Sequence, residues 1–324
     1  MPGFIQRAPA TTPSIGSLML PLLLALVPVA ILQTWLFGVR VLLLLVAAVG
    51  VAVVTEAVIL YFRGRAVGPA LRDGSAAVAG ALLGLAVAPG LALWQLALGT
   101  IFAVAAAKHA YGGIGRNPFN PAMAGYAFLL VSFPAELAVW PATMDGLSGA
   151  TPLDTAHALA RGAEVPDVTT PGQTSRVWTH PQSSAAAAFA WLNIAWLAGG
   201  CLLVKLGIIH WRMPTAVLLG IGVAAWVASM TGGTAPFWQH WFTGASMAAA
   251  FFIATDPVSA PRSVRAAWPF GLLIGMVVVV IREYGAYPDG VAFAVLLANC
   301  IAPLLDRLYG RGDRSDLGKP GDAP

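Results

Sequence analysis

The chain has 324 residues, of which only 10% are charged and 58% are apolar, and its mean hydropathy is +0.77. Soluble domains carry about a quarter of their residues as Asp, Glu, Lys and Arg, so this composition excludes an ordinary soluble enzyme, a coiled coil and a disordered chain. In such an apolar chain the net charge of +4 favours basic loops beside a membrane over nucleic-acid binding. Two cysteines cannot supply the four ligands of an iron–sulfur cluster, so a redox role needs another cofactor.

Apolar segments along the chain predict ten transmembrane helices, since about 20 apolar residues cross the hydrocarbon core of a bilayer. In chain order the predicted spans are 18–38, 40–62, 74–90, 91–108, 121–140, 185–204, 214–231, 242–255, 267–283 and 288–305. The third and eighth are short and rich in Gly and Ala, which indicates helices that are tilted, broken or buried in the bundle. The first is longer than a signal-peptide core and is not followed by a convincing cleavage site, so we expect it to remain as a helix.

The basic residues predict the orientation of these spans. With the N-terminus in the cytoplasm, 14 of the 18 basic residues lie on the cytoplasmic side, as the positive-inside rule requires. The same orientation places the C-terminus inside. Residues 1–17 are then a cytoplasmic segment, 18–305 form one transmembrane domain, and 306–324 form a basic cytoplasmic tail.

A polar outward loop, 141–184, separates two halves of the domain, 18–140 and 185–305. Five spans in each half would give the halves opposite orientations, which is the inverted-repeat plan of many transport proteins. Weak sequence echoes support a repeat, because Gly74-Ser75-Ala76 opens the third span and Gly244-Ala245-Ser246 opens the eighth. The alternative is chance recurrence of small residues in membrane helices.

A polar segment, 112–121, lies between the fourth and fifth spans. Its two Asn-Pro pairs end regular helix, because the residue before proline avoids the α region. One helical turn would place Asn117 and Asn120 on one face, where the two amides could hydrogen-bond a polar heterocycle. The alternative is a capped turn that starts the fifth helix.

Four carboxylates in or beside the spans are candidates for handling a transported ion. They are Glu56 inside the second span and Asp73, Asp256 and Asp289 at span ends. Glu56 could instead pair with a neighbouring helix, the aspartates could cap helices, and Asp256 could pair with Arg262 or Arg265. The five histidines lie in or beside predicted loops without metal-ligand spacing, so no metal site is predicted. Most of the eleven Trp are predicted to be interface anchors.

The outward loop contains the sequence Asp145-Gly146-Leu147-Ser148-Gly149-Ala150-Thr151. It resembles the acceptor motif at which flavin transferases attach FMN, through its phosphate, to a threonine hydroxyl. Background frequencies give such a match in far fewer than about one in a thousand chains of this length. Segments 115–121, 251–259 and 287–293 resemble, in the same order, segments of one family. That family comprises the D-type subunit of the Rnf ion-translocating oxidoreductase complex and its relative, the B-type subunit of the sodium-translocating NADH:quinone oxidoreductase.

The resemblance covers about residues 15–310 and implies two flavin cofactors. Thr151 would carry FMN as a covalent phosphoester on the periplasmic side of a bacterial inner membrane. The attachment motif would consist of Asp145, Gly146, Ser148, Gly149, Ala150 and Thr151. A non-covalent riboflavin would lie near the inner face, because Asn117 and Asn120 match the asparagines associated with it. Region 157–183 departs from the family, since its Arg161, Glu164 and His180-Pro181 match no signature, which leaves the FMN surroundings unpredicted.

The resemblance also implies an all-α polytopic fold, similar to urea and ammonium channels, and a role in a complex. That complex couples electron transfer between ferredoxin and NAD to movement of Na⁺ or H⁺. This chain would relay electrons through flavin without catalysis by the isolated subunit. Its partners would be the other Rnf subunits, a periplasmic flavin transferase and membrane lipid, with no nucleic acid. A passive solute channel of the same fold and a scaffold without cofactors are the alternatives, and the acceptor motif argues against a channel.

Overall fold

The computed structural model describes residues 15–113, 115–140, 149–150, 184–231, 237–285, 287 and 289–313, and it is built almost wholly of helices. The first half contains α1 (Ile15–Phe37), α2 (Arg40–Phe62), α3 (Val67–Leu71), α4 (Ser75–Ala86), α5 (Leu93–Phe102), the π-helical η1 (Ala103–His109), α6 (Pro121–Ser132) and α7 (Pro134–Ala138). The second half contains α9 (Ser184–Lys205), α10 (Arg212–Met230), α11 (Gln239–Phe242), α12 (Ser246–Ala248), the π-helical η2 (Ala249–Ile253), α13 (Ala267–Tyr284) and α14 (Val291–Asp313). Two short strands, β1 (Val139–Trp140) and β2 (Gly149–Ala150), pair antiparallel.

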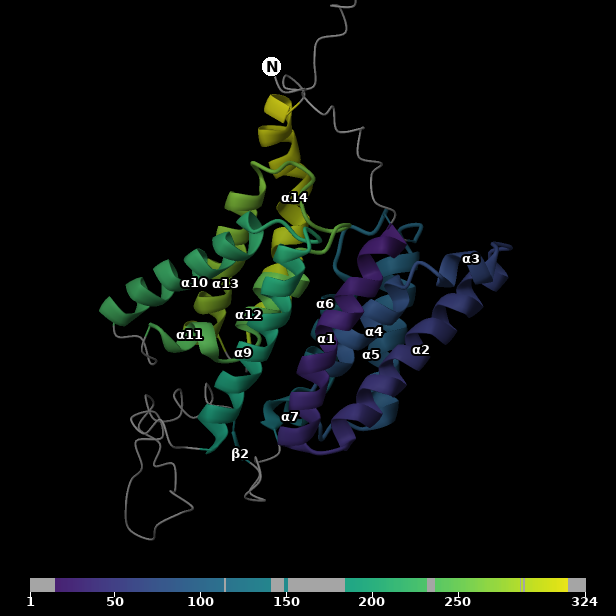
Figure 1. The fold of residues 1–324 in the computed structure, drawn as a ribbon, viewed down its shortest axis with the longest axis horizontal. Coiled ribbons are helices and arrows are strands. Elements are labelled where there is room, and N and C mark those ends of the chain that lie inside the picture. The colour runs from purple at the N-terminus through teal and green to yellow at the C-terminus, as the bar shows by residue number, and fades with distance from the viewer. Residues whose placement is uncertain are drawn as a thin grey trace, which may run out of the picture.

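The two halves form two groups of helices side by side. In Figure 1 the purple and blue helices α1 to α6 lie together, the green and yellow helices α10 to α14 lie together, and α1 packs against α9 at the junction. Contacts of α14 with α6 join the groups further. One continuous cluster of buried apolar side chains therefore runs through both halves.

Among the described residues, six helices are long and apolar enough to cross a membrane, namely α1, α2, α9, α10, α13 and α14. Every predicted span contains helix, but α4, α6 and the α12–η2 pair are shorter than the spans 74–90, 121–140 and 242–255. The fifth span is shorter because Phe133 leaves the helical region (φ −137°, ψ 57°) before Pro134. The chain is thus a helical, multi-pass membrane protein, and the count of ten crossings stays a prediction.

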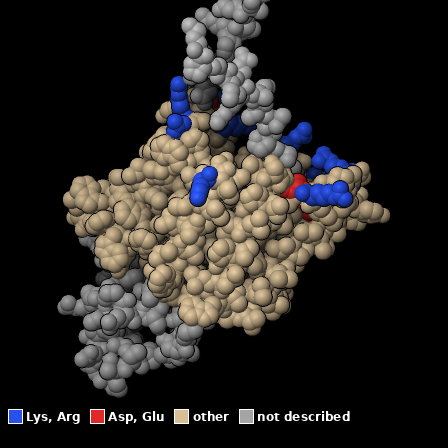
Figure 2. All heavy atoms as spheres, viewed as in Figure 1, with Lys and Arg blue, Asp and Glu red and all other residues tan. Residues whose placement is uncertain are grey.

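The surface agrees with a membrane setting. Large apolar side chains on α1 and α2 are exposed, among them Leu24, Ile31, Val46 and Val54. On the face in Figure 2, Lys and Arg gather toward the end of the molecule at which α14 finishes, and the surface below them is almost free of charge. A wide uncharged band of this kind suits contact with lipid.

Glycines in left-handed conformations set the starts of the two short central helices. Gly74 (φ 73°) directly precedes α4, and Gly244 (φ 55°) lies two residues before α12. Other side chains rarely adopt this region of φ, so glycine permits both sharp turns. The sequence echo around residues 74 and 244 therefore corresponds to two similar helix starts, each leading into one of the cavities described below.

Candidate functional site

The larger of two internal cavities lies between the halves and is called here the aromatic cavity, after its lining by Tyr126, Trp140, Phe189 and Trp196. Gln33 and Asp289 add polar groups to an otherwise apolar wall. Trp140 meets the ring of Phe189 edge-on at 5.5 Å. An apolar hollow with a few polar groups is typical of sites for organic ligands.

Two residues of the DGLSGAT segment, Gly149 and Ala150, pair with the strand that contributes Trp140 to the aromatic cavity. Strand β2 pairs with β1 so that Gly149 lies opposite Trp140 and Ala150 lies opposite Val139. The predicted acceptor Thr151 directly follows Ala150 in the chain. Thr151 itself lies outside the described residues, as do Asp145, Gly146 and Ser148 of the motif.

The smaller cavity is called here the amide cavity because Asn117 and Asn120 line it. Lys108, Ser75 and Asp256 also line it, beside apolar side chains such as Met19 and Phe252. The structure thus brings together the two predicted asparagines and one of the four candidate carboxylates. Asn117 and Val258 also line an open polar basin next to it.

The two asparagines of the amide cavity differ in their bonding. Asn120 caps α6, because its Oδ1 accepts from the Met123 N–H at 3.1 Å, so the capped turn is confirmed for this residue. Its other groups join the halves: Nδ2 lies 3.5 Å from the Ile253 carbonyl, and its N–H donates to Asn299. Among the described residues, the Asn117 side chain makes one hydrogen bond, in which Nδ2 donates to the Phe119 carbonyl.

A buried ion pair lies beside the amide cavity. Lys108 Nζ donates to Glu56 Oε1 and to Ser75 Oγ, both at 2.6 Å. His109 Nε2 lies 3.1 Å from the same Glu56 oxygen. The Ser75 hydroxyl in turn donates to Asp73. Glu56 therefore makes the helix-to-helix pairing that the sequence allowed, and Asp73 accepts bonds at the start of α4.

A second buried charge cluster lies in the other half. The fully buried Arg282 pairs with Asp289, at 2.9 Å from Nε to Oδ1, and also donates to Ser246 Oγ at 2.8 Å. Asp289 accepts from the Ala245 and Gly290 N–H groups as well. Because Asp289 lines the aromatic cavity, each cavity has one of these clusters beside it.

Asp256, the last of the predicted carboxylates, has Ser259 as its hydrogen-bond partner. Its Oδ2 accepts from the Ser259 hydroxyl at 2.6 Å and from the Ser259 N–H at 3.3 Å. Burial raises the pKa of the Asp256 carboxyl above its usual range, and the bonds from Ser259 act against that rise. The bonds from Ser259 make Asp256 a turn cap, which is one of the alternatives that the sequence allowed.

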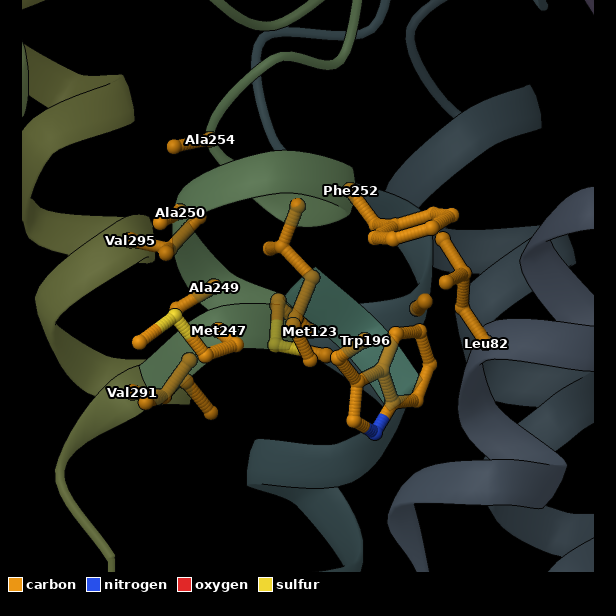
Figure 3. Packing of buried hydrophobic residues seen from close by; sticks show 14 of the residues in the cluster. Leu82, Met123, Trp196, Met247, Ala249, Ala250, Phe252, Ala254, Val291 and Val295 are labelled. Carbon is orange, nitrogen blue, oxygen red and sulfur yellow. The ribbon is translucent and has the colours of Figure 1, made fainter. Parts of the chain in front are cut away.

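Only a thin apolar wall separates the two cavities. Leu82 lines both of them, and the ring of Trp196 in the aromatic cavity meets Phe252 of the amide cavity at 5.0 Å and 76°. Figure 3 shows Leu82, Phe252 and Trp196 gathered at this place, with Met123 beside them. The side chains of Leu82, Phe252 and Trp196 therefore pack between the two cavities.

Several residues of these clusters were missed by the sequence analysis. His109 and His240 lie beside loops as predicted, but the sequence analysis did not predict that both are buried, 3.1 Å from Glu56 and Glu283 respectively. Lys108 and Arg282 counted there as charges at the membrane surface, although both are buried. The available signal was their position inside apolar helical runs, where a charge requires a partner.

Fold and cavities together define the class: a multi-pass helical membrane protein whose described part contains two internal cavities, each next to a buried ion pair. Comparison with known proteins then gives the family. The chain belongs to the NQR2, RnfD, RnfE family, whose model matches residues 8–312. The resemblance inferred from the motifs is thereby confirmed.

Individual relatives carry one name, that of the D-type subunit of an ion-translocating oxidoreductase complex. The protein of Aeromonas hydrophila is 42% identical, over 90% of this chain and 92% of that protein. The protein of Yersinia enterocolitica is 39% identical over 92% and 95%, and that of Vibrio cholerae is 40% identical over 89% and 93%. Family membership therefore supports electron transport, ion translocation and a membrane location for this chain.

Proposed function

We propose that this chain is the flavin-carrying membrane subunit of an ion-translocating oxidoreductase complex in the bacterial inner membrane. Within that complex, electron transfer between ferredoxin and NAD would be coupled to movement of Na⁺ or H⁺. The names of its relatives support membership of such a complex. The chemistry that bound flavins supply is electron transfer, and the protein holds them and sets their surroundings.

Covalent FMN at Thr151 is the first part of the proposal, and a periplasmic flavin transferase would attach it. The observation that carries it is the pairing of β1 with β2, which holds Gly149 opposite Trp140 of the aromatic cavity. The lining of the aromatic cavity fits a flavin ring. Trp140, Phe189 and Trp196 supply apolar aromatic rings, and Gln33 and Asp289 supply polar groups. These residues would hold the isoalloxazine ring and exclude water from it.

Riboflavin in the amide cavity is the second part. A flavin ring carries both hydrogen-bond donors and acceptors on its edge, and the cavity presents amide, ammonium and carboxylate groups from Asn117, Lys108 and Asp256. Asn120 would act indirectly, because its own groups are used to cap α6 and to reach Ile253 and Asn299.

The membrane topology is the third part, with ten crossings, both termini in the cytoplasm, and two inverted halves. Support comes from corresponding contacts in the halves: the cation of Lys108 donates to Ser75 at the start of α4, and that of Arg282 donates to Ser246 at the start of α12. Short central helices such as α4 suit the broken helices found in many inverted-repeat transporters. The DGLSGAT loop would then face the periplasm.

The ion path remains a proposal for Glu56, Asp73, Asp256 and Asp289. All four carboxylates accept hydrogen bonds in the structure, and Asp256 and Asp289 also line cavities. A passive solute channel is the competing function. The wall of Leu82, Trp196 and Phe252 argues against it, because a channel needs a continuous path between the two cavities.

Purification of the tagged chain from its native membrane tests the proposed function. We expect it to copurify with other subunits, and the preparation to reduce NAD⁺ with reduced ferredoxin while vesicles accumulate Na⁺ or H⁺. An ionophore should then accelerate the electron transfer. A chain that purifies alone, and speeds solute equilibration across liposomes, would support the channel instead.

The asparagines of the amide cavity should behave differently on substitution. Asn117→Leu is expected to lower the non-covalent flavin content of purified protein about tenfold with little loss of thermal stability, since a lost polar contact to a ligand is worth about 1–2 kcal/mol. Asn120→Leu should also lower the melting temperature, because it removes the cap of α6. Flavin extraction and thermal unfolding measure both effects. Unchanged flavin content in Asn117→Leu would contradict the assignment of this cavity.

A further inference from the structure

The buried cations Lys108 and Arg282 occupy corresponding places, but only one of them has all its donors bonded. The guanidinium of Arg282 has five N–H donors. Nε donates to Asp289, Nη1 to Ser246 and the His240 carbonyl, and Nη2 to Asp289 and the Thr243 carbonyl. Arg282 is therefore fully occupied in holding its own half together.

Lys108 has a spare donor. Its ammonium carries three N–H groups, and within the described part of the chain two of them are bonded, to Glu56 and Ser75. The side chain is 3% exposed, and it lines the amide cavity. A buried ammonium donor without a protein acceptor is costly, so an acceptor is expected from whatever fills the cavity.

The charges around Lys108 give the cavity a polarity. Glu56 forms an ion pair with Lys108. Lys108 lines the cavity and Glu56 does not, so the positively charged member of the pair faces the ligand. Asp256 and the amides of Asn117 and Asn120 are the other polar groups of the lining from the facing elements, together with Ser75. Lys108 also lies at the end of the π-helical segment η1, a distortion frequent at functional sites.

We propose that Lys108 is a binding residue of the amide cavity, donating its third N–H to a carbonyl or ring-nitrogen acceptor of a planar heterocycle. Asn117 Oδ1 can accept a hydrogen bond from an N–H of the same ligand, because the Asn117 side chain is bonded to the described residues only through Nδ2. The inference rests on the proposed non-covalent flavin and adds one property: the positive charge of Lys108 favours the reduced ligand and raises its reduction potential, whereas the Asp256 carboxylate in the same lining acts against it.

The test uses the full chain with Thr151→Ala, so that any flavin signal comes from the amide cavity. Three proteins are compared with this parent: Glu56→Gln, the double variant Glu56→Gln/Lys108→Met, and Lys205→Met. The double variant avoids a buried, unpaired Glu56. Lys205 is exposed at the end of α9, so its change matches that of Lys108 away from the cavity. Riboflavin affinity and the reduction potential of bound riboflavin are measured in each.

Glu56→Gln should raise the potential, because it removes the negative partner and leaves the ammonium. Adding Lys108→Met should reverse the shift and weaken riboflavin binding about tenfold or more. A tenfold change in the reduced-to-oxidised ratio corresponds to about 30 mV for two electrons. If Glu56 and Lys108 served only the structure, both variants would shift the reduction potential of bound riboflavin in the same direction.

Two results would overturn the inference and are distinguishable. If the parent binds riboflavin and the double variant matches Lys205→Met in affinity and potential, Lys108 does not contact the ligand. If the parent binds no riboflavin, the proposed inner flavin fails, and the role of Lys108 fails with it.

Discussion

Replacement of Arg282 by methionine is expected to lower the stability of the protein by roughly 3–5 kcal/mol, the usual effect of removing one member of a buried ion pair. Methionine fills a similar volume but donates no hydrogen bond. The change leaves the Asp289 carboxylate without its cation, and it deprives Ser246 and the His240 and Thr243 carbonyls of a donor. The turn that begins α12 at the aromatic cavity loses its support at the same time.

Thermal unfolding in detergent measures this effect, with the folded fraction determined by fluorescence-detected size-exclusion chromatography. Arg307→Met is the matched control, because Arg307 is exposed on α14 and should change the melting temperature little. Arg282→Met/Asp289→Leu should regain part of the lost stability, since no unpaired charge then remains buried. Equal melting temperatures for Arg282→Met and Arg307→Met would show that the cluster is not a structural centre.

The helices could be predicted from the sequence because local apolar runs determine them. Span 40–62 coincides with α2, and span 267–283 differs from α13 by one residue. The helix ends were predicted less accurately where proline or glycine changes the direction of the chain, as at Phe133 before Pro134. Short central helices cannot be counted as crossings from length alone, so the number of crossings does not follow from the same pattern.

The charge clusters could not be predicted, because they depend on contacts distant in sequence. Lys108 and Glu56 are 52 residues apart, and Arg282 and Ser246 are 36 apart. A lysine at the end of an apolar run has the same local sequence whether it lies in water or against a buried glutamate. Only packing of η1 against α2 distinguishes the two.

The candidate flavin site was partly predictable for a different reason. The DGLSGAT motif is specific enough to indicate the family from the sequence alone. Its proximity to Trp140 could not be read from the sequence, because it depends on two two-residue strands. The cavity-lining role of Trp196 was also missed, since most tryptophans of a membrane protein lie at the interface.

Thr151→Ala is expected to abolish covalent flavin completely, because a phosphoester requires a hydroxyl oxygen and alanine has none. The fold should tolerate the change, since a threonine lost from a loop usually alters stability by less than about 1 kcal/mol. Thr155→Ala is the matched control, with the same substitution four residues later in the same loop. It should retain the full flavin content.

The most direct test of covalent flavin on this chain is in-gel fluorescence of the denatured protein after co-expression with a flavin transferase. We expect a fluorescent band for the unsubstituted protein and for Thr155→Ala, and a dark band for Thr151→Ala at equal protein load. Equal fluorescence in all three proteins, or no fluorescence in any, would contradict covalent flavin at Thr151.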